Sequence, residues 1–367
     1  MIYLDNGATS MGKPPQVAHA MTRALAVCGN PGRGGHRAAM AAAEMVYGCR
    51  EEAAGMFGCQ AQQVVFTTSC THGLNIAIKS LAGRGSRVVI SGFEHNAVLR
   101  PLHSIGAEIT VAGRRLFEPA DTLEAFEKAL RAGAQMAVFT HVSNVFGYIL
   151  PVEELAALCR SYGVPFVVDA AQSAGMLPID LGALGAEFIA MPGHKGLLGP
   201  QGTGLLLCSG CPIPLLQGGT GSDSRNREMP DWLPDSLEAG TLNVPGIAGL
   251  REGLRHLRRE GIGKIAQRQH LAAVACAEGL RGLGIQVFSG ECQGGTVSFV
   301  PHMDCEEMAA ALAKQSIAVR AGLHCAPLAH ESAGTLETGT VRVSFGHDAS
   351  LQQARQLVQG VKVAEVM

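Results

Sequence analysis

The sequence predicts an α/β protein, with a large domain built around a mostly parallel sheet and a smaller α+β domain after it. Short apolar runs rich in β-branched residues alternate with helix-like segments as far as Cys208. A stretch rich in Gly, Ser, Asp and Pro then runs from Leu216 to about Pro245 and interrupts this alternation. Beyond it, helix and strand patterns resume in the mixture that is typical of an α+β unit.

The elements of the large domain follow from the spacing of their apolar residues. Apolar residues that return at three- and four-residue steps predict helices at Pro15–Ala26, Arg37–Phe57, Thr71–Leu81, Thr122–Arg131 and Val152–Tyr162. Short continuous apolar runs predict buried strands at Val64–Phe66, Arg87–Ser91, Glu108–Ala112, Met136–Thr140, Pro165–Asp169, Glu187–Met191 and Gly204–Cys208.

The C-terminal part has fewer elements, and we expect a helix near Gly246–Glu260 to bridge to it. Its predicted elements are helix Gln267–Leu283, strand Thr296–Val300, helix Cys305–Gln315, strand Val341–Phe345 and a terminal helix. The predicted division is an N-terminal segment over residues 1–14 that packs with the small domain, a large domain over residues 15–250 and a small domain over residues 251–367.

Composition and charge argue against several classes of protein. The chain has 367 residues, of which 47% are apolar and 16% charged, as in a well-buried globular protein. Its formal net charge is −2 and it has no long run of Lys or Arg, so neither a nucleic acid nor an anionic membrane is expected as a partner. We expect a small-molecule substrate.

Cysteine usage and the N-terminus predict a cytoplasmic protein. The eleven cysteines are odd in number and irregularly spaced, unlike a disulfide framework. Cys208 and Cys211 have the spacing of half a zinc site, but no second ligand pair accompanies them, so we expect a turn and no metal. The N-terminus lacks a basic stretch followed by an apolar one, and no apolar run reaches the length of a membrane span.

A lysine and an aspartate at the ends of successive predicted strands form a recognisable chemical pair. Asp169 ends one strand, and Lys195 follows the next in the segment Met191-Pro192-Gly193-His194-Lys195-Gly196. Pyridoxal phosphate needs a lysine to hold its aldehyde as a Schiff base and an acid to keep its pyridine nitrogen protonated. Asp169 alone could cap a helix and Lys195 alone could be a solvated surface residue. Their joint placement favours a cofactor site.

Two further segments follow strands and carry polar side chains. Cys70, Thr71 and His72 open a predicted helix, where hydroxyl and backbone N–H groups could bind a phosphate, although ordinary N-capping explains the pattern equally well. His95 offers a flat ring and a proton-transfer group just past the strand that ends at Ser91. A lone histidine is more often structural, and its place after a strand is what favours a role for it.

The C-terminal part contributes a thiol and an arginine in a strand-like run. Cys325 lies in a segment punctuated by Gly and Pro, with Arg320 and His324 close enough in sequence to favour a thiolate, although most cysteines are inert buried residues. In an extended segment His324 and Cys325 would point in opposite directions, so adjacency does not make His324 the base. Arg342 could bind a substrate carboxylate in bidentate fashion or form a surface salt bridge.

Together these segments resemble the class V, fold-type I pyridoxal-phosphate enzymes, and among them the cysteine desulfurases of the SufS-like branch. The resemblance runs nearly end to end, through Tyr3–Thr9, Asn30–His36, the Lys195 segment, Glu238–Asn243, Arg320–Ala326 and Arg342. It implies a fold-type I large domain and the cofactor pyridoxal 5'-phosphate.

The resemblance also implies roles for individual residues. Lys195 would form the Schiff base, Asp169 would pair with the pyridine nitrogen, Gln172 would contact the ring hydroxyl and His95 would stack on the ring. Cys70 and Thr71 would belong to the cofactor site, with Thr71 and His194 holding the phosphate. Thr241 would reach the phosphate of a partner subunit, which implies a homodimer. The substrate site would comprise Ala8, Asn144 and Arg342.

Three positions depart from the family pattern. Pro192 stands where a phosphate-binding serine is usual, His72 stands where glutamate is usual, and Leu323 stands where a polar residue is frequent. The missing hydroxyl at position 192 removes one phosphate contact, which costs about 1 kcal/mol and more where the acceptor is charged.

The function implied is that of a cysteine desulfurase. Lys195, Cys325 and His95 would be catalytic, L-cysteine would yield L-alanine and a persulfide on Cys325, and a sulfur-acceptor protein would take the sulfur. The alternatives are a selenocysteine lyase or another pyridoxal-phosphate-dependent C–S lyase, then a class V aminotransferase, and finally a non-catalytic cofactor-binding scaffold.

Overall fold

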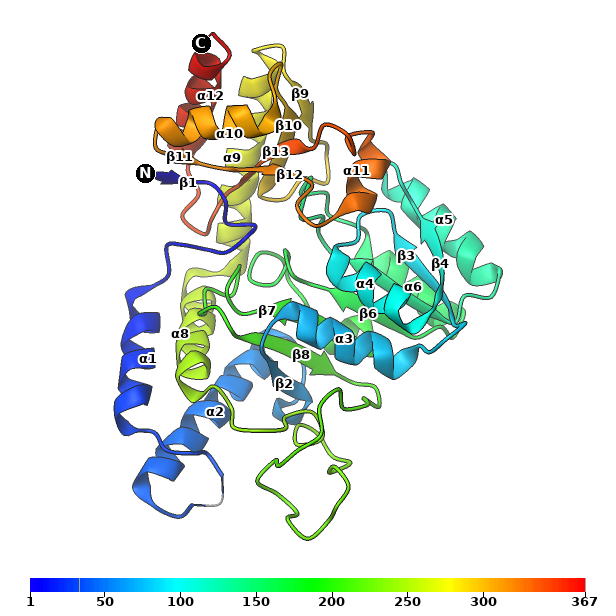
Figure 1. Ribbon diagram of the computed structural model, residues 1–367, viewed down its shortest axis with the longest axis vertical. Helices are drawn as coiled ribbons and strands as arrows, with labels where there is room; N and C mark the ends of the chain where they lie inside the picture. Colours follow the sequence, from blue (N-terminus) through cyan, green and yellow to red (C-terminus); the bar gives the residue numbers. More distant parts are fainter. Residues whose placement is uncertain (33, 367) are drawn as a thin grey trace.

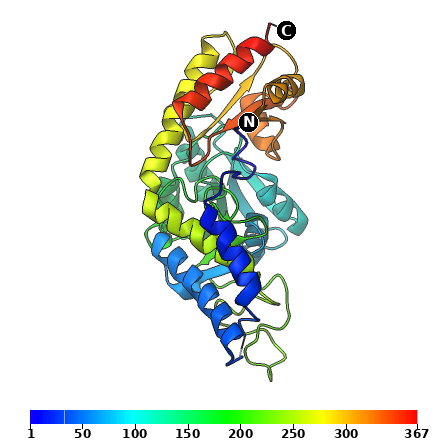
Figure 2. The same ribbon diagram turned by 90° about the vertical axis from the view of Figure 1, so that its left-hand side faces the viewer.

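The computed structural model describes residues 1–32 and 34–366, so Arg33, within one of the segments that resemble the family, lies outside the described residues. The larger part of the molecule holds a central sheet between helices, and the smaller part holds the C-terminal elements together with the N-terminus (Figure 1). Helices α8 (Val244–Glu260) and α9 (Ile262–Arg281) run along one side from the larger part to the smaller (Figure 2).

A seven-stranded sheet forms the centre of the larger part, in the order β2-β8-β7-β6-β5-β3-β4. Its strands are β2 (Val64–Thr67), β3 (Arg87–Ser91), β4 (Glu108–Ala112), β5 (Met136–Thr140), β6 (Phe166–Asp169), β7 (Phe188–Pro192) and β8 (Gly204–Cys208). The strands from β7 to β4 are parallel, and β8 is antiparallel to both of its neighbours. The predicted mostly parallel sheet is confirmed, and each predicted strand is present to within one residue at either end.

Helices cover both faces of this sheet, which is why its strands read as continuous apolar runs. Side chains alternate between the faces along each strand. On β5, Ala137 and Phe139 pack with α2, α5, α6 and α8, whereas Met136 and Val138 pack with α3 and α4. The helices are α1 (Pro15–Val27), α2 (Arg37–Met56), α3 (Cys70–Leu81), α4 (Asn96–Ile105), α5 (Pro119–Arg131), α6 (Val152–Ser161) and α7 (Leu181–Leu184), with a 3₁₀ turn at Ala61–Gln63.

The smaller part has an antiparallel four-stranded sheet in the order β12-β13-β10-β9. These strands are β9 (Gln286–Phe288), β10 (Thr296–Val300), β12 (Arg320–Gly322) and β13 (Thr340–Ser344), and α9, α10 (Cys305–Lys314) and α12 (Leu351–Ala364) pack around them in one core. Strand β1 (Ile2–Tyr3) pairs in parallel with β11 (Ile317–Ala318). The helix α11 (Pro327–Ala333) follows the Cys325 segment.

The predicted division at residue 251 falls within α8, which packs on α1 and α2 of the larger part. Helix α9 begins directly after Gly261 and packs on α12 of the smaller part. The domain boundaries stay a prediction, but the packing places the change of partner at the junction between the two helices.

Helix α4 has no counterpart in the prediction. Pro101 lies inside it and removes a backbone donor, which argues against a helix interior. Burial of Val98 and Leu102 against the sheet outweighs that preference. Within the described residues, no helix combines the length and the apolar character needed to cross a membrane.

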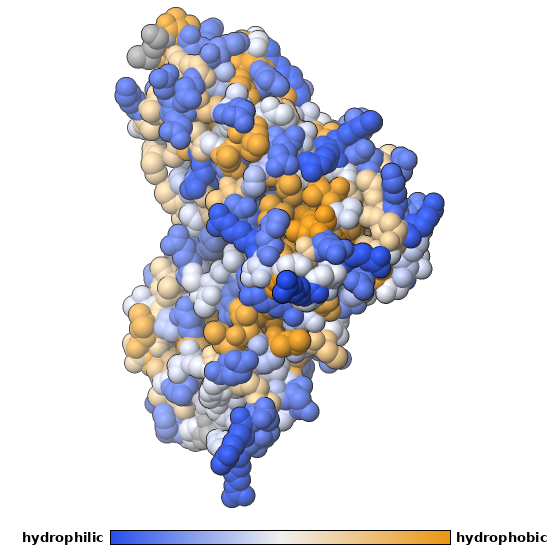
Figure 3. All heavy atoms as spheres, turned by 45° about the vertical axis from the view of Figure 1, so that its right-hand side comes forward, coloured by the Kyte–Doolittle hydropathy of each residue, from blue (hydrophilic) through white to orange (hydrophobic). Residues whose placement is uncertain are grey.

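The face drawn in Figure 3 carries its largest apolar patch near the middle of the molecule, with smaller ones elsewhere among hydrophilic residues. The two ends of this face carry mainly hydrophilic residues. A surface of this kind is ordinary for a globular protein, because single exposed apolar side chains are common and only larger patches mark a site.

A buried ion pair joins the edge of the sheet to the segment before α8. Arg50 of α2 donates to Glu238, and both side chains are almost fully buried. Glu238 Oε1 also accepts the backbone N–H of Phe66 at 2.7 Å, and the Arg50 guanidinium lies 4.5 Å from the centre of the Phe66 ring. Removing one partner of such a pair leaves the other charge buried and uncompensated.

We expect Glu238→Gln to lower the free energy of unfolding by about 3 kcal/mol, because the Arg50 charge loses its counter-charge in a buried site. The midpoint of urea unfolding, followed by circular dichroism, measures the effect. Glu127→Gln is the matched control, since the Arg131–Glu127 pair is exposed and exposed pairs contribute little. Equal midpoints for the two variants would contradict this role of Glu238.

Candidate active site

The site forms where the carboxyl ends of β6 and β7 meet. Asp169 is the last residue of β6 and lies opposite Ala190 of the parallel strand β7. Strand β7 ends at Pro192, and Gly193 and His194 lead to Lys195. The two ends therefore share one edge of the sheet, as the sequence predicts, and this is where open α/β sheets bind ligands.

Asp169 is buried and held by two contacts to one of its oxygens. Its Oδ1 accepts the backbone N–H of Ala171 at 2.8 Å and lies 3.4 Å from the Sγ of Cys70. Burial raises the pKa of Asp169, while the Ala171 N–H and the Lys195 charge act in the other direction. Burial and the Asp169 charge raise the pKa of the Cys70 thiol well above its usual range, so Cys70 remains a donor. Both contacts leave Oδ2 for a further donor.

Lys195 sits in an environment that favours its neutral amine. Burial lowers the pKa of Lys195, and the nearby Arg342 charge lowers it further, while Asp169 opposes both effects. A neutral amine is the form that attacks an aldehyde. Burial disfavours the charged ammonium form of Lys195, and it thereby favours the neutral amine that covalent chemistry requires.

The N-terminal strap, residues 2–13, holds the carbonyl groups of the Lys195 loop. Ser10 Oγ lies 3.0 Å from both the His194 and the Lys195 carbonyl oxygens, and Ser10 N donates to the former at 3.1 Å. Lys13 Nζ reaches the His194 carbonyl at 3.2 Å, and burial lowers the pKa of Lys13 to about 8. Sequence reasoning missed Ser10 and Lys13, because only the fold brings the strap to this loop.

His95 caps helix α4 and is fixed by that role. Its Nδ1 accepts the backbone N–H of Ala97 at 3.0 Å. Burial, with a smaller contribution from the Lys195 charge, lowers the pKa of His95 to about 4, so the ring is neutral at physiological pH. The N–H of Asn96, the first residue of the helix, donates to the Cys325 carbonyl at 2.8 Å. The structure thus brings the predicted ring-stacking residue and the predicted nucleophile together.

Cys325 lies exposed on a turn with unusual backbone geometry. His324 and Cys325 have φ angles of 50° and 58°, and Gly322 has φ 104°. The prediction that His324 and Cys325 would point apart in an extended segment is wrong about the backbone, since these residues are left-handed. Their side chains nevertheless differ in environment, because His324 is buried with Nε2 3.2 Å from the Thr340 carbonyl, while Cys325 is exposed.

Left-handed backbone costs a non-glycine residue about 1–3 kcal/mol. Two hydrogen bonds maintain it here. Asn144 Nδ2 donates to the His324 carbonyl at 2.8 Å, and Asn96 N donates to the Cys325 carbonyl at 2.8 Å. Burial and the Arg342 charge lower the pKa of His324 to about 3, so His324 stays neutral and is a weak base.

Arg342 is buried on β13 and faces the same site. Its Nη1 donates to the Asn144 carbonyl at 3.1 Å, and its Nη2 lies 2.7 Å from Asp5 Oδ1. The alternative of a surface salt bridge is wrong, because Arg342 is 2% exposed. Within the described part of the chain its Nε has no hydrogen-bond partner.

The other predicted residues differ in how close they come to this centre. Gln172 Nε2 donates to the Gly7 carbonyl at 3.0 Å, which leaves its oxygen and second N–H for a ligand. His194 Nδ1 lies 3.0 Å from Thr9 Oγ1, and burial lowers the pKa of His194 to about 4. Ala8 lies half-buried in the strap, and Thr71 is exposed in the first turn of α3.

Thr241 stands apart from the rest. It is exposed and lines a cavity of about 630 Å³ together with Pro31, Tyr47 and Glu238, and no residue of the Lys195 site lines that cavity.

The structure also describes the three residues that depart from the family pattern. Pro192 ends β7 opposite Gly204, and His72 Nδ1 lies 3.4 Å from the Thr68 hydroxyl. Leu323 is exposed beside the Cys325 turn.

A second buried carboxyl group near the site escaped sequence reasoning. Glu94 is fully buried, its Oε1 accepts the backbone N–H of Thr140 at 2.8 Å and the Ser91 hydroxyl, and burial raises its pKa to about 8. It is therefore protonated at neutral pH. The only signal in the sequence was an acidic residue between a buried strand and His95.

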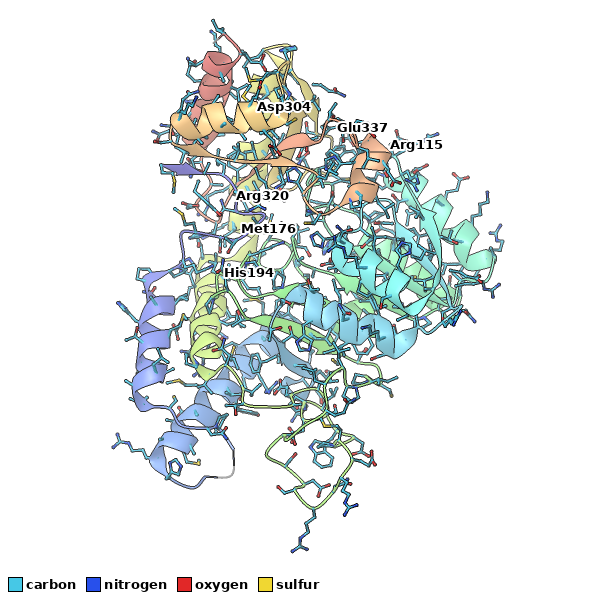
Figure 4. All side chains as sticks on the ribbon, viewed as in Figure 1. Arg115, Met176, His194, Asp304, Arg320 and Glu337 are labelled. Atoms are coloured by element: carbon cyan, nitrogen blue, oxygen red, sulfur yellow. The ribbon has the colours of Figure 1, made fainter. Side chains whose placement is uncertain are left out.

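The donor set fits pyridoxal phosphate. A lysine with a lowered pKa, a buried carboxylate with a free oxygen, a neutral histidine ring and an unpaired arginine Nε converge on one edge of the sheet. These groups match the needs of a cofactor that condenses with an amine, carries a pyridine nitrogen and acts on amino acids. Figure 4 marks Arg320 and His194, which lie at the junction of the two parts of the molecule and contact the N-terminal strap from opposite sides.

Known proteins share this architecture along the whole chain. The family model described as Aminotransferase class-V matches residues 2–357. The chain belongs to the class-V aminotransferase family. A probable cysteine desulfurase of Methanothermobacter thermautotrophicus is 33% identical to it, over 94% of this chain and 90% of that relative. Another, from Pyrococcus abyssi, is 32% identical over 96% and 91%.

Solved structures agree with the sequence relatives. The apo structure of a cysteine desulfurase from Thermococcus onnurineus NA1 matches with a TM-score of 0.91 and 32% identity, covering 100% of this chain and 95% of that one. The Escherichia coli cysteine desulfurase CsdA matches with a TM-score of 0.86 and 25% identity, covering 99% and 94%. The resemblance to cysteine desulfurases and the fold-type I class expected from the motifs are confirmed.

We expect Lys195→Ala to lose covalent attachment of pyridoxal phosphate, because Lys195 supplies the amine that forms the Schiff base beside Asp169. Incubation with the cofactor, reduction with borohydride and peptide mass spectrometry locate the adduct. Lys264→Ala, an exposed lysine in α9, should keep the adduct at position 195. An adduct of unchanged yield in Lys195→Ala would contradict the assignment.

Proposed function

We propose that this protein is a pyridoxal-phosphate-dependent cysteine desulfurase that converts L-cysteine into L-alanine and leaves a persulfide on Cys325. The observation that carries the proposal is the exposed Cys325 turn, which is hydrogen-bonded through its carbonyl to the helix that His95 caps. A thiol at that place has a use in sulfur transfer and none in transamination.

Each step is assigned to a residue of this chain. Bound pyridoxal phosphate supplies an aldehyde for amine exchange and an electron sink at the substrate Cα. Arg342 and Asn144 hold the substrate carboxylate, and Asp169 holds the proton of the pyridine nitrogen. Lys195 would hold the cofactor and would be the base that takes the α-proton of the substrate. The proposed site is completed by cofactor contacts from Cys70, Thr71, Gln172 and His194. It also includes a substrate contact from Ala8.

The sulfur transfer balances without any added oxidant. The Cys325 Sγ attacks the substrate sulfur as a thiolate, so an S–S bond forms while the substrate Cβ–S bond breaks. The electron pair of the broken bond stays with the substrate carbon, which is then protonated to give alanine. Cys325 is left as a persulfide, and its exposed position lets a sulfur-acceptor protein reach it.

The proposed setting is a homodimer in the cytoplasm. Every cysteine in the described residues is free, as expected in a reducing compartment. Thr241 lies on a different surface from Lys195, so a phosphate contact by Thr241 requires a second subunit. A substitution at Thr241 can therefore test the proposal of a homodimer.

We expect Cys325→Ala to bind cofactor normally but to form no alanine from L-cysteine in a single turnover, because the substrate sulfur has no acceptor. Chromatographic measurement of alanine checks this. Cys211→Ala, which removes another exposed thiol, should behave like the wild type. Undiminished alanine formation by Cys325→Ala would instead favour a selenocysteine lyase or another C–S lyase, and a panel of cysteine, selenocysteine and cystine would then identify the substrate.

We expect Thr241→Val to raise the dissociation constant of pyridoxal phosphate about fivefold, because it removes one hydrogen bond to a charged acceptor. Titration of the apoenzyme with cofactor, followed by absorbance, measures the change, and sedimentation gives the oligomeric state. Unchanged affinity in a monomeric protein would contradict the proposed arrangement.

A further inference from the structure

The buried guanidinium of Arg342 is held from two sides. Asp5 Oδ1 lies 2.7 Å from Nη2, and the Asn144 carbonyl accepts from Nη1 at 3.1 Å. Within the described residues, Nε is the nitrogen of this side chain that lacks a partner. These contacts select one rotamer of Arg342 and leave the Nε–H and one N–H on each terminal nitrogen for a substrate carboxylate.

Asp5 is itself fixed by the backbone around it. Ser344 N donates to the Leu4 carbonyl at 2.7 Å, and Asn6 N donates to the Ser344 carbonyl at 3.3 Å, so Asp5 lies in a short strand-like pairing beside β13. Gly7 N donates to Ser344 Oγ at 2.7 Å, and a Cβ at Gly7 would lie 3.3 Å from the Arg342 Cζ. The strap therefore passes directly against the guanidinium.

The second oxygen of Asp5 has its own partner. Arg320 Nε and Nη2 both lie 3.0 Å from Asp5 Oδ2, and Arg320 is about half exposed. Each oxygen of Asp5 thus meets a different arginine, and the carboxylate cannot rotate away from Arg342 without breaking both contacts. Figure 4 shows Arg320 at the junction, on the side of the smaller part.

We propose that Asp5 is a positioning residue for Arg342, which holds the guanidinium so that the substrate carboxylate meets preoriented N–H donors. The proposal rests on the proposed function, in which Arg342 binds the carboxylate of an amino acid. It adds that the acceptor oxygen of Asp5 sets the affinity for that carboxylate. Nothing else in the described structure accepts a hydrogen bond from Nη2.

Asp5 affects binding of the substrate carboxylate in two opposite ways, by orienting Arg342 and by repelling the carboxylate. The proposal requires the orientation of Arg342 to have the larger effect on affinity. Orientation of Arg342 favours binding, because a displacement of about 1 Å in a binding group costs much of its affinity. The negative charge of Asp5 repels a carboxylate. Removing the side chain therefore weakens binding if Asp5 positions Arg342, and strengthens binding if Asp5 mainly competes with the substrate.

The test measures binding of L-alanine to the holoenzyme by calorimetry, alongside the cofactor affinity of each apoenzyme. Asp5→Ala should raise the L-alanine dissociation constant at least about tenfold. Asp5→Asn keeps an acceptor for Nη2 and should stay within about threefold of the wild type. Glu127→Ala, which removes an exposed carboxylate paired with Arg131, is the matched control and should change neither affinity.

The outcomes separate the alternatives. Equal or tighter L-alanine binding by Asp5→Ala would overturn the proposal. The proposal would also be overturned if Asp5→Ala lowered the cofactor affinity and the unfolding midpoint as much as it lowered the affinity for L-alanine. If Asp5→Ala fails to fold, Asp5→Glu moves the carboxylate by one methylene, and unchanged affinity in that variant would overturn the proposal equally. A wild-type holoenzyme that does not bind L-alanine would remove the proposed function itself, and the role of Asp5 with it.

Discussion

The parallel pairing of β6 and β7 is the constraint on which the site depends. Parallel neighbours end at the same edge of a sheet, so Asp169 and the loop to Lys195 must lie side by side wherever that register is kept. The residues of both strands are completely buried between helices, which prevents the register from slipping. A reactive amine and its opposing carboxylate are thereby held at one edge of the buried central sheet.

Burial has different consequences for the different groups at this edge. It lowers the pKa of Lys195 and of His95, and raises the pKa of Asp169 and of Glu94. The shared cause is the loss of water around a charge. Neighbouring charges then separate the groups, because the Lys195 charge lowers the pKa of Asp169 whereas the Asp169 charge raises the pKa of Glu94 further. One carboxyl group can remain charged while the other stays neutral.

The N-terminal strap connects the two parts of the molecule at the site. It pairs with β11 and contacts β13 in the smaller part, then holds the carbonyl groups of His194 and Lys195 in the larger part. The strap therefore touches both the lysine loop and the arginine that is proposed to bind the substrate. Its contacts with the rest of the molecule combine backbone hydrogen bonds, polar and charged side chains and the buried Leu4, a mixture with no apolar periodicity.

The sequence by itself determined the alternation of strands and helices, and with it the sheet edge that carries Asp169 and Lys195, because apolar periodicity and burial are local consequences of residue order. It also singled out Cys325 and Arg342, since few residue types do their chemistry. Only the tertiary structure decided that His95 and Cys325 share a hydrogen-bonded junction, that Asp5 faces Arg342, and that Thr241 lies away from Lys195. These are contacts between segments far apart in the chain, and their existence depends on how the two parts pack rather than on any pattern within a segment.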